Sequence, residues 1–93
     1  MRKYELTVIL PADLEKEDNE KLLGKIKKAI EDGKGKIEKA DDWGKKDFAY
    51  EIKKLKEGNY YYWEFSVEPS QLFDIDRKIK AEEKILRYLL VKV

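Results

Sequence analysis

The segment Tyr60–Val67, which reads YYYWEFSV, decides the fold of this 93-residue chain. Successive side chains along a β-strand point to opposite faces. One face of the segment is wholly apolar and consists of Tyr61, Trp63, Phe65 and Val67. The other face is mixed and consists of Tyr60, Tyr62, Glu64 and Ser66. We therefore predict a strand that buries one face in a core and leaves its other face open.

Upstream of this strand lies a second long extended segment, which a glycine interrupts. Lys36–Trp43 and Lys46–Lys54 both favour extended structure, and Gly44 lies between them. A glycine inside a strand typically marks a bulge or a bend. We predict one long, kinked strand at an edge of the sheet, and Lys56–Asn59 after it predicts a turn.

The first third of the chain predicts a strand and then a helix. Lys3–Leu10 alternates apolar and polar side chains, as a half-buried strand does. From about Lys16 the apolar residues recur at helical spacing, and Gly33 and Gly35 end that helix. The apolar stripe of the helix consists of Leu22, Leu23, Ile26, Ala29 and Ile30.

The last third predicts a second helix and a final strand. Pro69 and Ser70 begin the helix, which we expect to run to about Lys80. Ile85–Val93 is rich in β-forming residues. We expect Leu86, Tyr88 and Leu90 to point inward, although the opposite set is also apolar and consists of Ile85, Leu89, Val91 and Val93.

The order strand, helix, strand, strand, helix, strand predicts an α+β fold of the ferredoxin-like βαββαβ type. Two right-handed crossovers then place both helices on one face of a four-stranded antiparallel sheet. A chain of 93 residues suits one domain, which we assign to residues 1–93. The second face of the sheet is left to solvent or to a partner.

The net charge and the residue types present exclude several classes of function. Lys and Arg number 21 against 20 acidic residues, so a net charge of +1 gives no overall attraction for a polyanion. The sequence has no His and no Cys, which removes the usual general base, the thiolate nucleophile and the common transition-metal ligands. We predict a protein that is not an enzyme, with no catalytic residue, metal site or cofactor, in a cytoplasmic setting.

Four stretches resemble the bacterial small-subunit ribosomal protein six family, and the similarity covers nearly the whole chain. They are the start Met1–Glu5, the run Trp43–Ile52, the turn Lys54–Tyr60 and the end Leu86–Lys92. The resemblance implies a ferredoxin-like, non-enzymatic protein that binds the central domain of 16S ribosomal RNA together with small-subunit protein eighteen. Family positions that are commonly basic, and thus candidates for contact with RNA phosphate or a partner, fall on Arg2, Lys45, Lys46, Lys80 and Arg87.

The chain also departs from the pattern of that family. Glu51 stands where proline is usual, Asp47 where the family has a basic or neutral polar residue, and Lys45 and Lys46 where it has arginines. Each change weakens contact with RNA or partner but keeps the fold. We interpret the chain as an engineered sequence on the family's backbone, without demonstrated binding and without partners. The alternative is a natural ribosomal protein of a thermophile, which binds 16S ribosomal RNA with protein eighteen.

The aromatic residues and the lysine pair allow more than one role. We expect Trp43, Tyr50, Trp63 and Phe65 to pack inside the protein. Tyr60 and Tyr62 lie on the open face, where they offer bases a surface to stack on, although Thr7 and Glu5 beside them are not aromatic. Lys45 and Lys46 either guard an edge strand against aggregation or contact RNA. A domain that binds only other proteins, through the edge or the open face, is the remaining hypothesis.

Overall fold

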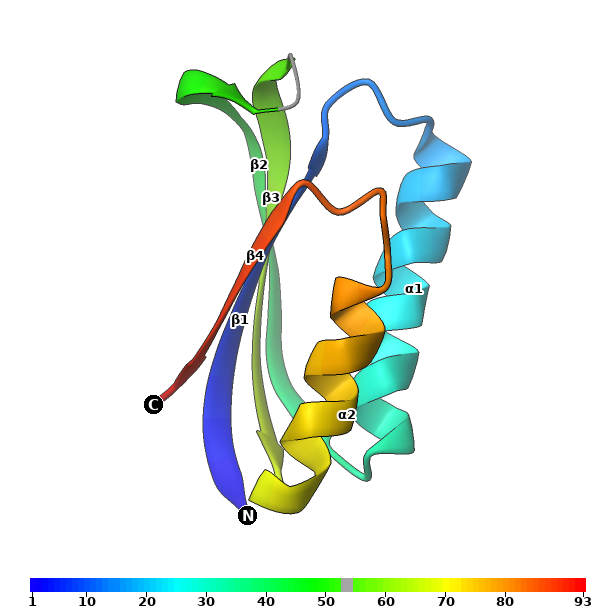
Figure 1. Cartoon of the computed structure of the whole chain (residues 1–93), viewed down its shortest axis with the longest axis vertical. Coiled ribbons are helices and arrows are strands. Elements are labelled where there is room, and N and C mark those ends of the chain that lie inside the picture. The colour runs from blue at the N-terminus through cyan, green and yellow to red at the C-terminus, as the bar shows by residue number, and fades with distance from the viewer. Residues whose placement is uncertain (53–54) are drawn as a thin grey trace.

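The predicted element order is confirmed in the computed structural model, which describes the backbone of residues 1–52 and 55–93 and the side chains of residues 1–48 and 55–93 (Figure 1). The strands pair in the order β2-β3-β1-β4, and each pair is antiparallel. The elements are β1 (Arg2–Pro11), α1 (Lys16–Asp32), β2 (Lys36–Ile52), β3 (Leu55–Val67), α2 (Pro69–Lys80) and β4 (Arg87–Lys92).

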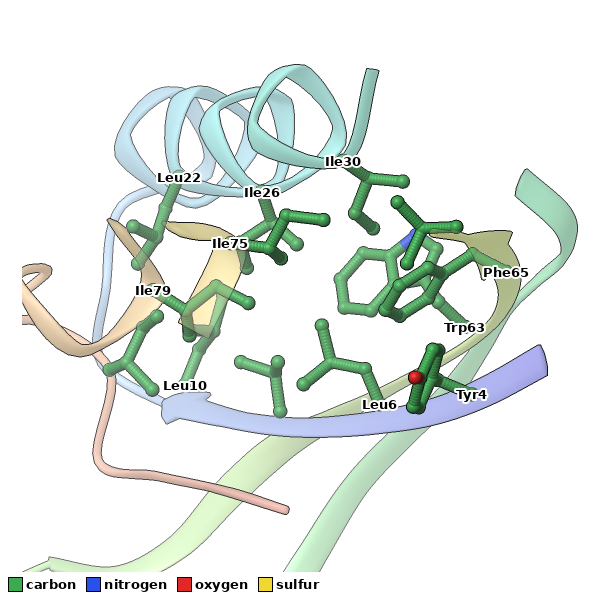
Figure 2. Packing of buried hydrophobic residues seen from close by; sticks show 13 residues of the cluster. Tyr4, Leu6, Leu10, Leu22, Ile26, Ile30, Trp63, Phe65, Ile75 and Ile79 are labelled. Carbon is green, nitrogen blue, oxygen red and sulfur yellow. The ribbon is translucent and has the colours of Figure 1, made fainter. Parts of the chain in front are cut away.

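Both helices cover the same face of the sheet, as Figure 1 shows. Figure 2 shows their apolar stripes meeting side chains of the two central strands: Ile26 of α1 and Ile75 of α2 lie above Leu6 of β1. These three side chains are 1% exposed or less. Burial of such side chains is the main favourable contribution to folding in a domain of this size. The fully buried set of large residues is Leu6, Val8, Leu10, Ile26, Ile30, Phe65, Val67, Ile75 and Ile79.

The final strand presents Tyr88 and Leu90 to the core side, as predicted, whereas the third predicted residue, Leu86, precedes the strand and is half-buried. The Tyr88 hydroxyl donates a hydrogen bond of 2.8 Å to Asp76, which joins β4 to α2. The opposite side chains Leu89 and Val91 are 62% and 40% exposed. Ile85 departs from this set because it precedes the strand, where its amide bonds to the Glu82 carbonyl at 3.2 Å and its side chain is buried.

Strand β2 is the kinked edge strand that Gly44 predicts. Its pairing with β3 shifts between Ile37 and Lys39 and again between Asp42 and Gly44. Gly44 has a φ of +78°, a conformation that glycine adopts at little cost. The Asp42 carboxylate accepts a 2.8 Å hydrogen bond from the Gly44 amide, which fixes the kink.

The predicted turn at Lys56–Asn59 is wrong, because these residues belong to β3. The hairpin extends further, to the Ile52 and Leu55 pair, and the predicted strand end at Lys53 and Lys54 lies outside the described residues. Gly58 misled the prediction, since glycine is common in turns. Here Gly58 pairs with Lys46 on one side and Pro11 on the other.

Gly58 is needed because neighbouring groups occupy the space of a side chain. A Cβ atom on Gly58 would lie 2.7 Å from Cζ of Phe48, 2.8 Å from Cγ2 of Ile9 and 3.0 Å from the Leu10 carbonyl oxygen. Two of these neighbours are side chains packed over the strand, and the third is backbone, which cannot move independently. The glycine therefore serves close packing inside a strand.

We predict that Gly58→Ala lowers the free energy of unfolding by about 1–3 kcal/mol, the usual range for overpacking. Gly24→Ala is the matched control, because nothing lies within 4 Å of a Cβ there and the residue is inside α1. That control should raise stability by about 0.5–1 kcal/mol. Urea denaturation of both variants and the parent measures the difference, and a neutral Gly58→Ala would contradict the packing argument.

Candidate interaction surface on the open sheet face

The face of the sheet opposite the helices carries a cluster of aromatic side chains. The rings of Trp43 and Tyr62 stack with centroids 4.8 Å apart and planes at 10°. Phe48 lies 6.4 Å from Tyr60 in a tilted arrangement. The Lys46 ammonium is 5.4 Å from the centroid of Trp43 and 5.5 Å from that of Tyr60, so one cation contacts both rings. These five residues form the aromatic cluster.

The bulge in β2 brings Trp43 to this cluster. Asp42 pairs with Tyr61 and Gly44 pairs with Tyr60, so Trp43 is the additional residue between two paired positions. Trp43 remains 43% exposed, whereas Tyr62 beneath it is 9% exposed. The prediction that Trp43 packs inside the protein is therefore wrong: it packs on the outer surface of the sheet. Trp63 and Phe65 are buried as predicted, and the Tyr50 side chain lies outside the described residues.

A network of charged groups lies beside the cluster at the centre of the face. Glu5 of β1 and Glu64 of β3 are directly opposite each other. The Tyr62 hydroxyl hydrogen-bonds the Glu5 carboxylate at short range and the Glu64 carboxylate at 3.0 Å, so the two carboxylates share one hydroxyl hydrogen. Lys3 lies 3.6 Å from Glu64 and 3.4 Å from Glu38.

The network shifts the pKa values of its members in the directions that its contacts require. The bond to Glu5, with burial and the bond to Glu64 adding to it, raises the pKa of Tyr62 above its ordinary value. The hydrogen bond from Ser66 lowers the pKa of Glu38, and the bond to Glu38 raises the pKa of Lys3. Tyr62 therefore stays neutral, Glu38 ionised and Lys3 protonated over a wider pH range than these side chains ordinarily do.

The five basic residues predicted as contacts lie in separate places. Lys46 and Arg87 lie at the same end of the open face, because Arg87 pairs with Ile9, Ile9 with Tyr60, and Tyr60 with Gly44. Both are exposed. These two are the members of the set that the fold brings to one surface.

The other three predicted contacts lie away from that end of the face. Lys45 is engaged within the hairpin, with its ammonium 3.8 Å from the Glu57 carboxylate. Arg2 pairs with Val67 at the opposite end of the sheet. Lys80 is the last residue of α2, in the helical layer, where it lines a shallow hollow together with Arg87.

Reasoning from the sequence missed Phe48 as a member of the open face and missed the opposition of Glu5 and Glu64. The alternation of each strand placed Glu5 and Glu64 on the correct face, but the register between strands decides which residues meet. Within residues 1–52 and 55–93, no group of His, Cys, Asp and Glu is arranged to hold a metal ion. The same residues contain no helix long and apolar enough to cross a membrane.

An α+β domain that exposes aromatic and charged side chains on an uncovered sheet face has the properties of a docking domain. The chain belongs to the Ribosomal protein S6 family, whose model matches residues 3–92. The family prediction made from the sequence is therefore confirmed.

Individual relatives match over nearly their whole length. The small ribosomal subunit protein bS6 of Desulforamulus reducens is 36% identical over 92 residues, which are 99% of this chain and 97% of the relative. The bS6 protein of Streptomyces coelicolor is 40% identical over 87 residues, 94% of this chain and 91% of the relative.

The crystal structure of 30S ribosomal protein S6 from Thermotoga maritima has a TM-score of 0.93 to this chain, with 33% identity, and covers 99% of this chain and 87% of that one. The fold prediction is thus supported by a solved structure as well. Together these similarities support the ribosomal-protein alternative better than the interpretation as an engineered sequence, which no finding shows.

We predict that replacing Tyr62 with phenylalanine changes how stability depends on alkaline pH. The folded protein holds the Tyr62 proton more tightly than the unfolded chain does, because the pKa is raised in the folded state. This contribution is complete below the ordinary tyrosine pKa of about 10 and is lost as the pH rises from there toward the raised value. Tyr62→Phe should therefore flatten the fall in unfolding free energy above about pH 10.

Urea denaturation at a series of pH values measures this effect. Tyr60→Phe is the control, since the described part of the chain gives the Tyr60 hydroxyl no carboxylate partner, and it should keep the parent's slope. A parent and a Tyr62→Phe variant with equal slopes would show that the hydroxyl bonds in solution differ from those in the structure.

Proposed function

We propose that this protein is a structural component of the small ribosomal subunit in the cytoplasm, where it binds the central domain of 16S ribosomal RNA together with small-subunit protein eighteen. Membership of the Ribosomal protein S6 family over residues 3–92 carries the proposal. The relatives' names place those proteins in the small subunit, and the near-complete mutual coverage makes a shared role the simplest inference.

The basic residues supply the contacts to RNA in this proposal. Lys46 and Arg87 share one end of the open face, so a single stretch of backbone phosphates can reach both. Lys80 lines the hollow next to Arg87 and extends this surface toward the helical layer. Lysine and arginine on phosphate act mainly through charge and the release of counterions, so the contacts favour RNA in general over a particular sequence.

The net charge explains why a partner is needed. With 21 basic and 20 acidic residues, the chain lacks the long-range attraction that draws most RNA-binding proteins to a polyanion. Several lysines are also engaged by carboxylates, as Lys45 is by Glu57. A second protein that binds the same RNA adds cationic surface, and joint binding turns two weak contacts into one strong one.

We predict that the protein binds a 16S central-domain fragment more tightly when protein eighteen is present, and that rising salt weakens binding. Lys46→Gln and Arg87→Gln should each lower the slope of log affinity against log salt by about 0.7–0.9, the change expected for one lost phosphate contact. Lys28→Gln, an exposed lysine on α1, is the control and should leave the slope unchanged. Filter binding at several salt concentrations measures the slopes.

Absence of binding to the fragment, both with and without protein eighteen, would contradict the proposed function. Binding that persists with unchanged slopes in the Lys46 and Arg87 variants would keep the function but move the RNA contacts elsewhere. In that case the same measurement on Arg2→Gln and Lys80→Gln locates them among the remaining basic candidates.

A further inference from the structure

We propose that a hollow between α1 and β2, on the helical side of the sheet, binds a small aromatic carboxylate through the indole N–H of Trp63 and the ammonium group of Lys27. The inference goes beyond the proposed function and does not depend on it. The hollow has a volume of about 380 Å³, and the lining residues on which the argument rests are Leu23, Gly24, Lys27, Ala40, Tyr61 and Trp63.

The hollow is open because the residues on its two sides are small. Nothing lies within 4 Å of a Cβ position on Gly24, so close packing does not require a glycine inside α1, where it costs stability. Ala40 of β2 pairs with Trp63 and is exposed. A second hollow of about 540 Å³ shares Lys27, Ala40 and Trp63 with the first. Spaces of this size suit a small ligand.

Trp63 presents an unused hydrogen-bond donor in the hollow. Its side chain is only 7% exposed, and its indole N–H has no acceptor among the side chains and backbone that the structure describes. In the same part of the chain, the polar atom that is both unpartnered and sealed from solvent is Oδ1 of Asn19, so the indole N–H reaches the surface. Figure 2 shows the indole nitrogen on the side of the ring that faces α1. Because a buried indole N–H usually has a partner, this donor favours a ligand with an acceptor.

Lys27 adds an available positive charge at the rim of the hollow. It is exposed, and no ion pair between the described side chains includes it. The two acids that also line the hollow have partners of their own. Asp41 lies 3.5 Å from the Lys39 ammonium, and Asp42 accepts the 2.8 Å hydrogen bond from the Gly44 amide. The ammonium group of Lys27 is therefore free to pair with an anionic ligand.

The apolar lining favours an aromatic ring as the body of the ligand. The rings of Tyr61 and Trp63 lie with centroids 6.3 Å apart and planes at 30°, and Leu23 lines the hollow with them. A further ring packs well against such surfaces in an offset or edge-to-face arrangement. A carboxylate on a short linker would then accept charge-assisted hydrogen bonds from the indole N–H and from Lys27.

Other classes of ligand fit the hollow less well. A cationic amine has no acceptor for the indole N–H of Trp63 and would lie beside the like charge of Lys27. An RNA strand brings several phosphates, whereas Lys27 is the single lysine of the 380 Å³ hollow and Asp41 and Asp42 would repel them. RNA is therefore better served by Lys46 and Arg87 at the end of the open face.

The test is an NMR titration of the ¹⁵N-labelled full chain with phenylacetate. The two tryptophans give two indole N–H signals, which Trp43→Phe assigns. The Trp63 signal should move downfield and saturate, with half-saturation at about 1 mM. The Trp43 signal, from the opposite face of the sheet, is the internal control and should stay in place.

Two related probes test the chemistry of recognition. Phenylacetamide keeps the ring and an acceptor but lacks the charge, so it should bind about threefold more weakly than phenylacetate. Phenethylamine keeps the ring but has no acceptor, and it should leave the Trp63 signal unmoved. Lys27→Gln should remove the preference for phenylacetate over phenylacetamide. Lys28→Gln is the matched control, because Lys28 lines the groove between the two helices, and it should keep that preference.

A variant that fills the hollow tests its location. Gly24→Leu should abolish the movement of the Trp63 signal with phenylacetate, because the new side chain occupies the binding space. Its thermal stability should not fall, since leucine favours helix far more than glycine does. Lys21→Leu adds the same side chain on another flank of α1, beside Lys84, and should leave binding unchanged.

Four outcomes overturn the inference. The Trp63 signal could fail to move or saturate with phenylacetate, or it could move equally with phenethylamine. Equal movement of the Trp43 and Trp63 signals would show non-specific contact with aromatic rings. Gly24→Leu with the parent's titration would place the carboxylate elsewhere. None of these outcomes bears on RNA binding, so the filter-binding measurement judges the proposed function separately.

Discussion

The antiparallel pairing of β1 with β3 is the constraint on which the rest of the structure depends. It places Tyr4 opposite Phe65 and Leu6 opposite Trp63, so that four apolar side chains meet under the two helices. Because side chains alternate along each strand, the residues between these buried positions point to the outer face. The register that builds the core therefore also brings Glu5 against Glu64, and a shift by one residue would move both sets to the wrong faces.

The length and kink of β2 determine which side chains the open face exposes. A regular edge strand would continue flat beside β3 and offer its free backbone groups to other chains. Here the register shifts, and the positive φ of Gly44 bends the strand and places Trp43 over Tyr62. The same irregularity thus works against edge-to-edge aggregation and places an exposed aromatic side chain, Trp43, on the open face.

The local pattern of apolar and polar residues was enough to predict the helices and strands and to predict which face of each strand is buried. The alternation in Tyr60–Val67 identified Tyr62 and Glu64 as outward-facing, and helical spacing identified Ile26 and Ile30 as buried. Contacts across strands were not predictable in this way, because they depend on register and bulges that no single segment specifies. Gly58 shows where prediction from local pattern fails. The residue types around it indicated a turn, whereas its role comes from Phe48 and Ile9, which pack over it.

A chain with almost no net charge can take part in an RNA-protein assembly if its positive and negative side chains lie on different parts of its surface. Lys46 and Arg87 give one end of the sheet a local positive charge, while Glu5 and Glu64 give its centre a negative one. Such a division disfavours non-specific binding to RNA, because the acids repel phosphate that approaches along the face.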